Sequence, residues 1–409
     1  MKSSFGYPVL ITIILSLLIP LPCIAGSSDI LIIKEGSQMD WADAHIDNNL
    51  VAAYVSSTKP PVIKVYHADG RIITEIPLSR EVMKLDALEI ANGRVYYSEY
   101  NPEEAGYLRN ETVYEYDLAT REKRIIYTTS GPQQKITKIA ASGDNIVLRG
   151  GSNSQILILH TRSTGTNRQI FTSNSMVHGL AIDGNRILWG CERIDREPGR
   201  EIHVYTISTG EDYVIPESKS VRTFGYGDIS GDSVVWVMGA KEPDYADGVP
   251  ITVESYDIHM MNLTSGKGRS IEISDTAPMT VPYISGNCVV WVKKPVIDYN
   301  NTDTGAIRVY NIGTGTFSDL TSEVASISDF SNGMVLWQTL KPMSFWVTSI
   351  SGNVPTNSSS ITTTAIPNPQ KTYTANTPAP ESPAGAIIIV LAVMGGIVVH
   401  VTMKRKRGR

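Results

Sequence analysis

The chain has 409 residues, with 36 Lys+Arg against 41 Asp+Glu and a formal net charge of −5. Hydrophobic residues make up 42% and charged residues 19%, which supplies a large core and excludes wholesale disorder. Three cysteines exclude a disulfide-built scaffold and any multi-cysteine zinc or iron–sulfur site, and the absence of a basic excess gives no indication of nucleic-acid binding.

Residues 1–25 have the pattern of a secretory signal peptide. Lys2 supplies the positive start, residues 9–21 the apolar stretch, and residues 23–25 (Cys-Ile-Ala) a cleavage site with small residues at both ends. A lipidated Cys23 is the alternative interpretation. Pro22 before the cysteine and the lack of a small residue after it favour cleavage after Ala25. The pattern therefore predicts export.

Residues 26–352 contain an internal repeat of about 40–55 residues, in the range of propeller repeats. Its first phrase is a small polar turn with Gly or Asn, followed by apolar, mostly β-branched residues that an aromatic residue usually closes. The copies are 46–53, 90–97, 141–148, 182–189, 229–236, 284–291 and 330–337. Its second phrase alternates apolar and polar residues and often ends in Thr-Gly or Ser-Gly, as in 202–210, 258–266 and 307–315. Such alternation between turns predicts strands joined by hairpins.

Seven copies with four strands each predict an all-β, seven-bladed β-propeller, with six or eight blades as the alternatives. The seventh copy lacks an outer strand before residue 353, and residues 29–34 supply a spare strand at the other end of the body. We expect this N-terminal strand to close the last blade, because an unpaired edge would template aggregation.

The C-terminal region has three parts. Residues 353–383 are rich in Ser, Thr and Pro and predict a disordered stalk. Residues 384–403 form an apolar run long enough for one transmembrane helix, and residues 404–409 are a basic tail that belongs in the cytoplasm. Setting aside Lys2 and the five basic residues of the tail leaves 30 Lys+Arg against 41 Asp+Glu, so the exported part carries −11. This layout predicts a cell-surface protein anchored in the cytoplasmic membrane.

The phrases ISGDSVVW and IHMMNLTSG, with their sisters ISGNCVVW and IRVYNIGTG, resemble the TolB-like β-propeller repeat of exported bacterial and archaeal surface proteins. This resemblance covers about residues 29–352 and implies the fold rather than an activity. The signal, stalk and anchor together look like a methanogen-type archaeal surface protein. The C-terminal SPAG, helix and basic tail also resemble signals that sortase-like enzymes remove, although a retained anchor is favoured because no full signature is present.

Four long loops lie on one face of the predicted propeller, at residues 98–112, 190–201, 238–256 and 293–306. Binding residues are often carried on such loops, so this long-loop face is the candidate binding surface. Its candidate residues, for a glycan, a cation or a partner protein, are Tyr100, Tyr107, Asp244, Tyr245, Asp298 and Tyr299. The alternative is a solvated rim that tolerates insertions.

Residues 298–309 faintly resemble a calcium loop, but the sixth position lacks Gly and Val309 stands where a Glu is expected, so no metal site is predicted. The chain has four Asn-x-Ser/Thr sequons, which are candidate glycosylation sites in an exported protein. They begin at Asn110, Asn262, Asn300 and Asn357.

The sequence lacks an HExxH motif, a GxSxG elbow and a Walker loop, and it indicates no cofactor. The histidines are scattered, several of them in strand positions, which suggests packing rather than ligation. Cys191 and Cys288 lie two repeats apart, which disfavours a disulfide between them. We therefore expect a membrane-anchored, non-catalytic binding, adhesion or envelope-scaffold propeller, with an envelope protein or glycan as partner. The alternative is a hydrolase or lyase acting on polysaccharide or peptide through paired carboxylates from different loops that meet in the central channel.

Overall fold

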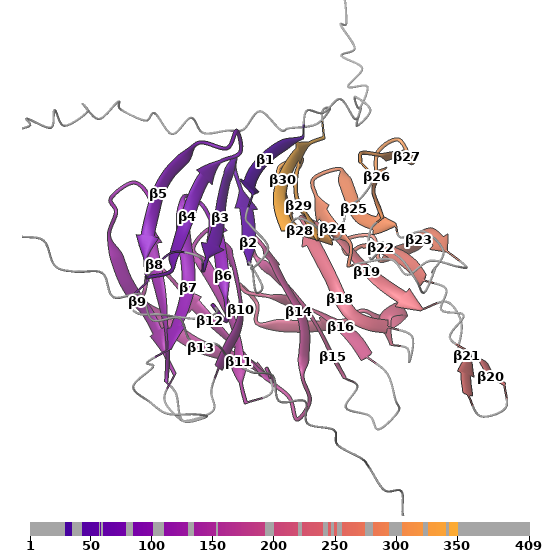
Figure 1. Ribbon diagram of the computed structural model, residues 1–409. Coiled ribbons are helices and arrows are strands. Elements are labelled where there is room, and N and C mark those ends of the chain that lie inside the picture. Colours follow the sequence, from indigo (N-terminus) through magenta and orange to yellow (C-terminus); the bar gives the residue numbers. More distant parts are fainter. Residues whose placement is uncertain are drawn as a thin grey trace, which may run out of the picture. The chain divides into compact units, whose positions relative to one another are not determined.

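The computed structural model describes the repeat region and not the two ends of the chain (Figure 1). The described residues are 29–34, 43–56, 58, 60–78, 85–100, 110–129, 135–152, 154–192, 200–219, 223–239, 244–246, 249–251, 256–274, 281–293, 305–321, 326–340 and 343–350. They form β-strands throughout, apart from one 3-10 turn at Pro216–Ser218.

Seven antiparallel sheets of four strands each make up the body, and we call them blades 1–7. Blade 1 contains β2 (Ala44–Asp47), β3 (Leu50–Val55), β4 (Val62–His67) and β5 (Ile72–Pro77). Blade 2 contains β6 (Leu88–Ala91), β7 (Arg94–Tyr100), β8 (Glu111–Asp117) and β9 (Lys123–Thr128). Blade 3 contains β10 (Lys135–Ser142), β11 (Asn145–Gly151), β12 (Ile156–Thr161) and β13 (Thr166–Thr172). Blade 4 contains β14 (Val177–Asp183), β15 (Arg186–Glu192), β16 (Arg200–Thr206) and β17 (Glu211–Val214).

The remaining blades repeat this order with two departures. Blade 5 contains β18 (Thr223–Ser230), β19 (Ser233–Gly239), β22 (Tyr256–Asn262) and β23 (Lys267–Ser274). Its second and third strands are separated by β20 (Asp244–Ala246) and β21 (Val249–Ile251), which pair with each other as a hairpin. Blade 6 contains β24 (Tyr283–Ser285), β25 (Cys288–Lys293), β26 (Ala306–Asn311) and β27 (Thr316–Asp319). Blade 7 contains β28 (Ser326–Ser331), β29 (Met334–Leu340), β30 (Met343–Ser349) and β1 (Ile30–Lys34).

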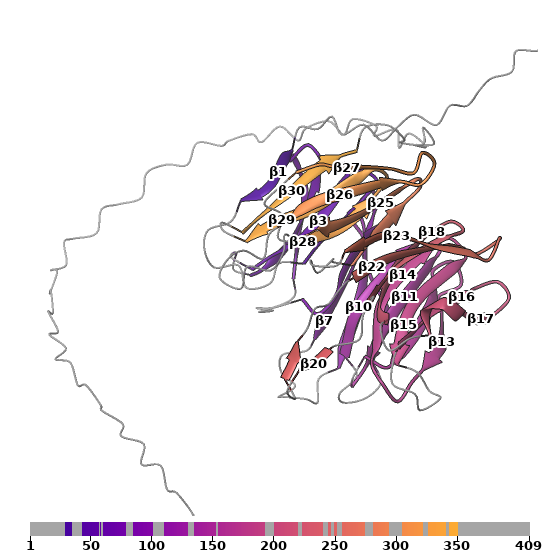
Figure 2. The same ribbon diagram turned by 90° about the vertical axis from the view of Figure 1, so that its right-hand side faces the viewer.

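The first strand of each blade contacts the first strand of the next, so β2, β6, β10, β14, β18, β24 and β28 form a closed ring. We call these the inner strands. The ring is closed by the two ends of the repeat region, since β1 pairs antiparallel with β30 through Ile30↔Val347 and Leu31↔Trp346. Figures 1 and 2 both show β1 beside β30. The predicted seven blades and the closure by the N-terminal strand are both confirmed.

The core is divided among the blade interfaces. Each of the seven hydrophobic clusters joins two neighbouring blades, from blades 1 and 2 round to blades 7 and 1. The aromatic residue that closes the first repeat phrase supplies the bulk, because Trp189, Trp236 and Trp291 are each at most 1% exposed. Full burial of such a side chain contributes roughly 1.5–3 kcal/mol or more. The repeated phrase is thus the packing unit between blades.

The predicted signal peptide, stalk, transmembrane helix and tail lie outside the described residues. Among the described residues, no helix is long and apolar enough to span a membrane. Cys191 is a free, buried thiol, which agrees with the expectation that it forms no disulfide with Cys288.

Candidate functional site

Side chains at the ends of the inner strands link neighbouring blades through the turns. In five places an Asp or Ser at the last inner-strand position accepts a hydrogen bond from a backbone N–H in the next blade's turn. The pairs are Asp47 with Asn92, Ser142 with Gly184, Asp183 with Gly231, Ser230 with Gly286 and Ser285 with Asn332. Blade 7 is joined to blade 1 by Ser331 Oγ donating to Asp47 Oδ1. We call this set the turn ring.

Ala91 occupies the same position in blade 2 and has no side-chain acceptor. The turn ring therefore lacks one link, between blades 2 and 3. The polar residue that precedes Gly or Asn in the repeated turn phrase now has a physical explanation, because it fastens each blade to the next.

Irregularities in the inner strands aim charged side chains at the propeller axis. The register of β10 shifts between Ile136 and Lys138, and that of β28 shifts between Ile327 and Asp329. Such β-bulges often re-aim a side chain. Asp329 then joins two blades, since Oδ1 accepts from Phe330 N–H in its own strand and Oδ2 from Ile46 N–H in blade 1.

Asp228 does the same between blades 5 and 6. Its Oδ1 accepts from Ile229 N–H and its Oδ2 from Ile284 N–H, both at 2.8 Å. Both aspartates thus hold neighbouring inner strands together and place a carboxylate on the axis.

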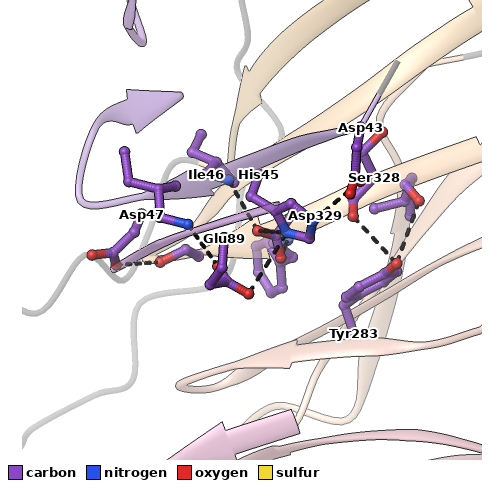
Figure 3. Close-up of polar contacts among 12 residues, drawn as sticks. Asp43, His45, Ile46, Asp47, Glu89, Tyr283, Ser328 and Asp329 are labelled. Carbon is purple, nitrogen blue, oxygen red and sulfur yellow. Dashed lines mark hydrogen bonds and ion pairs between the residues drawn. The ribbon is translucent and has the colours of Figure 1, made fainter. Parts of the chain in front are cut away.

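Charged side chains from four blades meet at the axis. Figure 3 labels Asp43, His45, Glu89 and Asp329, and together with Lys138 we call them the channel cluster. The Nδ1 atom of His45 lies 3.3 Å from Asp329 Oδ2 and 3.9 Å from Glu89 Oε2. Its Nε2 atom lies 3.3 Å from Asp43 Oδ1 and 3.4 Å from Lys138 Nζ. Glu89 also accepts a hydrogen bond from the N–H of the next residue in its strand.

The environment of the channel cluster favours a protonated His45. Burial and Lys138 oppose its charged form, but the three carboxylates outweigh them and raise the pKa to about 10. Burial raises the pKa of Glu89 to about 7, although His45 opposes the shift. Burial also acts to raise the pKa of Asp329, but its hydrogen bond and charge interaction with His45 prevail and lower it. His45 is therefore mainly the counter-ion of Asp329.

Four members of the cluster, His45, Glu89, Lys138 and Asp329, line an axial cavity of about 650 Å³. Five carboxylates from five blades line it among the described residues, namely Asp47, Glu89, Asp183, Asp228 and Asp329, against the basic side chains of His45, Lys138 and Arg149. Its lining includes turn-ring residues, so the cavity reaches the tight-turn end of the inner strands. Burial raises the pKa of Asp228 to about 7, and its two backbone N–H groups only partly oppose this.

Two groups of described side chains have ligand atoms close enough to hold a metal ion. In the channel, single atoms of His45, Glu89 and Asp329 lie within 4.8 Å of one another. In blade 4, the same holds for Cys191, Glu201 and His203. In both groups the histidine already pairs with carboxylates, His45 with Asp329 and His203 with Glu201 and Asp212. The blade-4 group differs in that it also contains a thiol.

The binding residues expected from the sequence lie elsewhere or outside the described residues. Tyr100 is the last residue of β7, and Asp244 and Tyr245 lie in β20. Tyr107, Asp298 and Tyr299 lie outside the described residues. The prediction of a binding surface on the long-loop face remains a prediction.

Among the predicted glycosylation sites, Asn110 directly precedes β8 and Asn262 ends β22. The Oδ1 atom of Asn262 accepts a hydrogen bond from Ser265 N–H in the following turn. Asn300 and Asn357 lie outside the described residues. Glycosylation itself remains a prediction.

Sequence reasoning missed the channel cluster. Its members come from residues 43, 45, 89, 138 and 329, and only ring closure brings them together. The sequence contained one sign of this cluster, because an Asp, Glu or Lys stands two to four residues before the turn of the first repeat phrase in several copies of the repeat. The expected meeting of carboxylates was placed on loops, whereas the described carboxylates meet from inner strands.

No family model matches the chain, and no curated protein matches it either. Among solved structures, an oligogalacturonate lyase in complex with manganese shares 11% identity over 80% of this chain and 98% of its own, with a TM-score of 0.49. TolB from Acinetobacter baumannii shares 14% identity, with 75% of this chain and 65% of its own covered and a TM-score of 0.39. A chain of the mitotic checkpoint complex shares 13% identity over 78% and 93%, with a TM-score of 0.45.

Proposed function

We propose that this protein is a binding propeller whose axial channel accepts a cationic group of an extracellular ligand. The observation that carries the proposal is the cavity of about 650 Å³, in which five carboxylates from five blades face three basic side chains. Cavities of roughly 300–1,000 Å³ are typical of small-molecule sites. An acidic channel with low-dielectric walls also concentrates cations.

The basic side chains leave part of the negative charge uncompensated. Arg149 is held at the wall, since it donates to Thr137 Oγ1 and to the carbonyls of Val177 and Gly179. Lys138 lies beside His45, in the same cluster as Glu89 and Asp329. Asp228, on blade 5, has backbone N–H groups as its hydrogen-bond donors. A cation near Asp228 would favour its ionised form and supply the missing charge.

Calorimetry with spermidine, Ca²⁺ and Mn²⁺ tests this proposal on the purified protein. We expect saturable binding of at least one probe near pH 7, with release of protons, because Glu89 and Asp228 have pKa values of about 7. Proton release is measured by repeating the titration in buffers of different ionisation enthalpy. The absence of binding by all three probes would overturn the channel proposal.

Glu89→Gln is the diagnostic variant, because the amide oxygen can still accept from Ile90 N–H while the negative charge is lost. We expect weaker binding and fewer released protons. Glu75→Gln is the matched control, since that half-exposed carboxylate pairs with Lys64 on the outer strands of blade 1. Equal affinity of the two variants would contradict a role of Glu89 in binding.

An enzyme is the second candidate, and one observation favours it. Glu89 and Asp329 present oxygens within 4.8 Å of each other, and their pKa values shift in opposite directions. Paired carboxylates with separated pKa values are typical of acid–base catalysis. Against this, both oxygens of Asp329 accept backbone N–H groups that join two blades. Turnover of a polysaccharide or peptide that Glu89→Gln abolishes would favour the enzyme.

We further propose that the propeller is exported and held at the cell surface by residues 384–403, with an envelope protein or glycan as its partner. The support is the order of signal, repeat body, Ser/Thr/Pro-rich segment, apolar run and basic tail. Membrane fractionation of the native host, with protease added to intact cells, tests it. A protease-protected or cytoplasmic propeller would contradict surface display. A mature chain lacking residues 384–409 would indicate removal of the anchor.

A further inference from the structure

A second polar cluster lies inside blade 4, away from the channel. Cys191 on β15 is directly opposite Glu201 on β16, and His203 follows two residues later on the same side of β16. The Sγ atom of Cys191 lies 3.2 Å from His203 Nε2, which in turn lies 3.3 Å from Glu201 Oε1. The other ring nitrogen, Nδ1, bonds to Asp212 on β17 at 2.9 Å. We call these four residues the blade-4 cluster.

We propose that Cys191, Glu201 and His203 form a binding site for a zinc ion. In a tetrahedral site with Zn–S about 2.3 Å and Zn–N or Zn–O about 2.0 Å, neighbouring ligand atoms lie about 3.3–3.6 Å apart. The distance from His203 Nε2 to Glu201 Oε1, 3.3 Å, agrees with this range, and the distance to Cys191 Sγ, 3.2 Å, requires a small outward shift of the sulfur. All three ligand atoms lie within 4.8 Å of one another.

The surroundings of His203 orient it as a metal ligand. Asp212 lies against Nδ1, so Nε2 is the ring nitrogen that faces Cys191 and Glu201, and zinc would take the place of a proton on Nε2. A carboxylate behind the distal nitrogen is the usual support of a metal-bound histidine. The ring also stacks on Trp189, with centroids 5.1 Å apart and planes 10° apart, which restricts its rotation.

The donor set favours zinc over calcium or magnesium. A thiolate and an imidazole are ligands of zinc, whereas calcium and magnesium prefer oxygen. On binding, the Cys191 thiol releases its proton to solvent and its sulfur forms the bond to the metal, with no change of oxidation state. Thiolate and carboxylate together then neutralise the charge of Zn²⁺. Three protein ligands leave a fourth position for water.

A cysteine nucleophile is the obvious competing interpretation of the Cys–His–Asp arrangement. Cys191 is 0% exposed and packs in the interface of blades 3 and 4 with Val177, Leu180 and Tyr205. A substrate has no access to a sulfur in that position, whereas a metal ion can be enclosed during folding.

Blade 5 supplies an internal control, because it repeats all of this arrangement except the sulfur ligand and the supporting Asp. His259 stacks on Trp236, and its Nε2 lies 3.3 Å from Asp257 Oδ2. The residue opposite Asp257 is Met238, in the place that Cys191 holds opposite Glu201. His259 is paired across the strands with Ser270. The two blades therefore differ in the thiol and in the carboxylate that supports the histidine.

The experiment uses full-length protein purified without chelators and kept reduced. We expect about one equivalent of bound zinc by elemental analysis. Replacement by Co²⁺ should produce a thiolate-to-cobalt charge-transfer band, which ligation by oxygen and nitrogen alone does not give. Cys191→Ser should lose the band and the zinc while staying folded, because a hydroxyl can still bond to His203. Asp212→Asn should weaken zinc binding by about 10- to 100-fold, as losses of supporting carboxylates do.

Two variants separate this site from the others. His259→Gln in blade 5 and Glu89→Gln in the channel should both leave the cobalt band unchanged. Absence of the band in the wild-type protein, or its persistence in Cys191→Ser, would overturn the proposal and leave a structural hydrogen bond between Cys191 and His203. Loss of channel binding in Glu89→Gln with the band intact would show that the two sites are independent.

Discussion

The channel cluster and the blade-4 cluster each combine a histidine with carboxylates, but they are built in different ways. The members of the channel cluster come from blades 1, 2, 3 and 7, whereas Cys191, Glu201 and His203 share one hairpin. In the channel, Asp329 already accepts two backbone N–H groups and a histidine contact. In blade 4, Nε2 of His203 faces a thiol and a carboxylate.

The difference in construction suits the two clusters to different roles. Carboxylates that join strands of different blades contribute to closing the ring, and an imidazolium among them balances their charge. The strand pairing of one hairpin keeps Cys191, Glu201 and His203 in register whether or not the ring of blades is closed. Their side chains therefore do not have to join different blades and can serve a ligand. The channel cluster should therefore respond most in stability and pH dependence, and the blade-4 cluster in metal content.

The largest expected effect is that of Asp329→Ala. The substitution removes the acceptor for Ile46 and Phe330 N–H. It also leaves His45, 5% exposed, without the carboxylate that faces Nδ1 at 3.3 Å. Breaking a buried ion pair in this way costs about 3–5 kcal/mol in the free energy of unfolding. Urea denaturation measures the loss. Asp319→Ala, which breaks a half-exposed pair with Arg308, is the control and should cost less than about 1 kcal/mol.

The pH dependence of stability should reveal the His45 imidazolium. Because its pKa is raised from 6.5 to about 10 on folding, its stabilising contribution is complete below pH 6.5 and disappears as the pH rises through 10. Asp43, Glu89 and Asp329 supply the attraction and Lys138 opposes it. The loss across this window should be on the order of 3 kcal/mol.

Melting temperature measured from pH 6 to pH 10 tests this dependence. His45→Gln should be less stable at pH 6 and should show a flatter decline above it. A decline as steep as that of the wild type would mean that another group is responsible.

Zinc should stabilise the protein through the blade-4 cluster alone. At a free zinc concentration 100 times the dissociation constant, linkage adds about 2.7 kcal/mol to the free energy of unfolding. We expect this gain in the wild type and in Asp329→Ala, but not in Cys191→Ser. Thermal denaturation with and without zinc measures it. If Asp329→Ala abolished the zinc-dependent stabilisation, the ion would instead bind in the channel, and the two clusters would not have the separate roles inferred above.

The smallest expected effect is a gain from Ala91→Ser. The hydroxyl would provide the side-chain acceptor that blade 2 lacks, opposite the turn at Gly143 in blade 3. One added hydrogen bond contributes about 0.5–1.5 kcal/mol. Denaturant midpoints compare the variant with Ala87→Ser, a buried position (1% exposed) just before β6 and outside the turn ring. Equal destabilisation by both variants would mean that the turn ring contributes little to closure.

Much of the fold could be predicted because each blade is a local unit. The alternation in 202–210 and the turns at Gly184, Gly231 and Gly286 identify hairpins without any distant contact. The blade-4 cluster was within reach of the same reasoning, since pairing Trp189 with His203 places Cys191 opposite Glu201. What was missing was the exact register, because a slip of one residue turns each side chain to the other face.

The sequence by itself determined the all-β class, the seven repeats and the strand that closes the last blade. Only the tertiary structure decided which charged residues meet, because His45 and Asp329 are brought to 3.3 Å across 284 residues by closure of the ring. Local periodicity indicates that a strand forms and which face it buries. The bulges that turn Lys138 and Asp329 toward the axis depend on how neighbouring blades pack, and that information is spread over the whole ring.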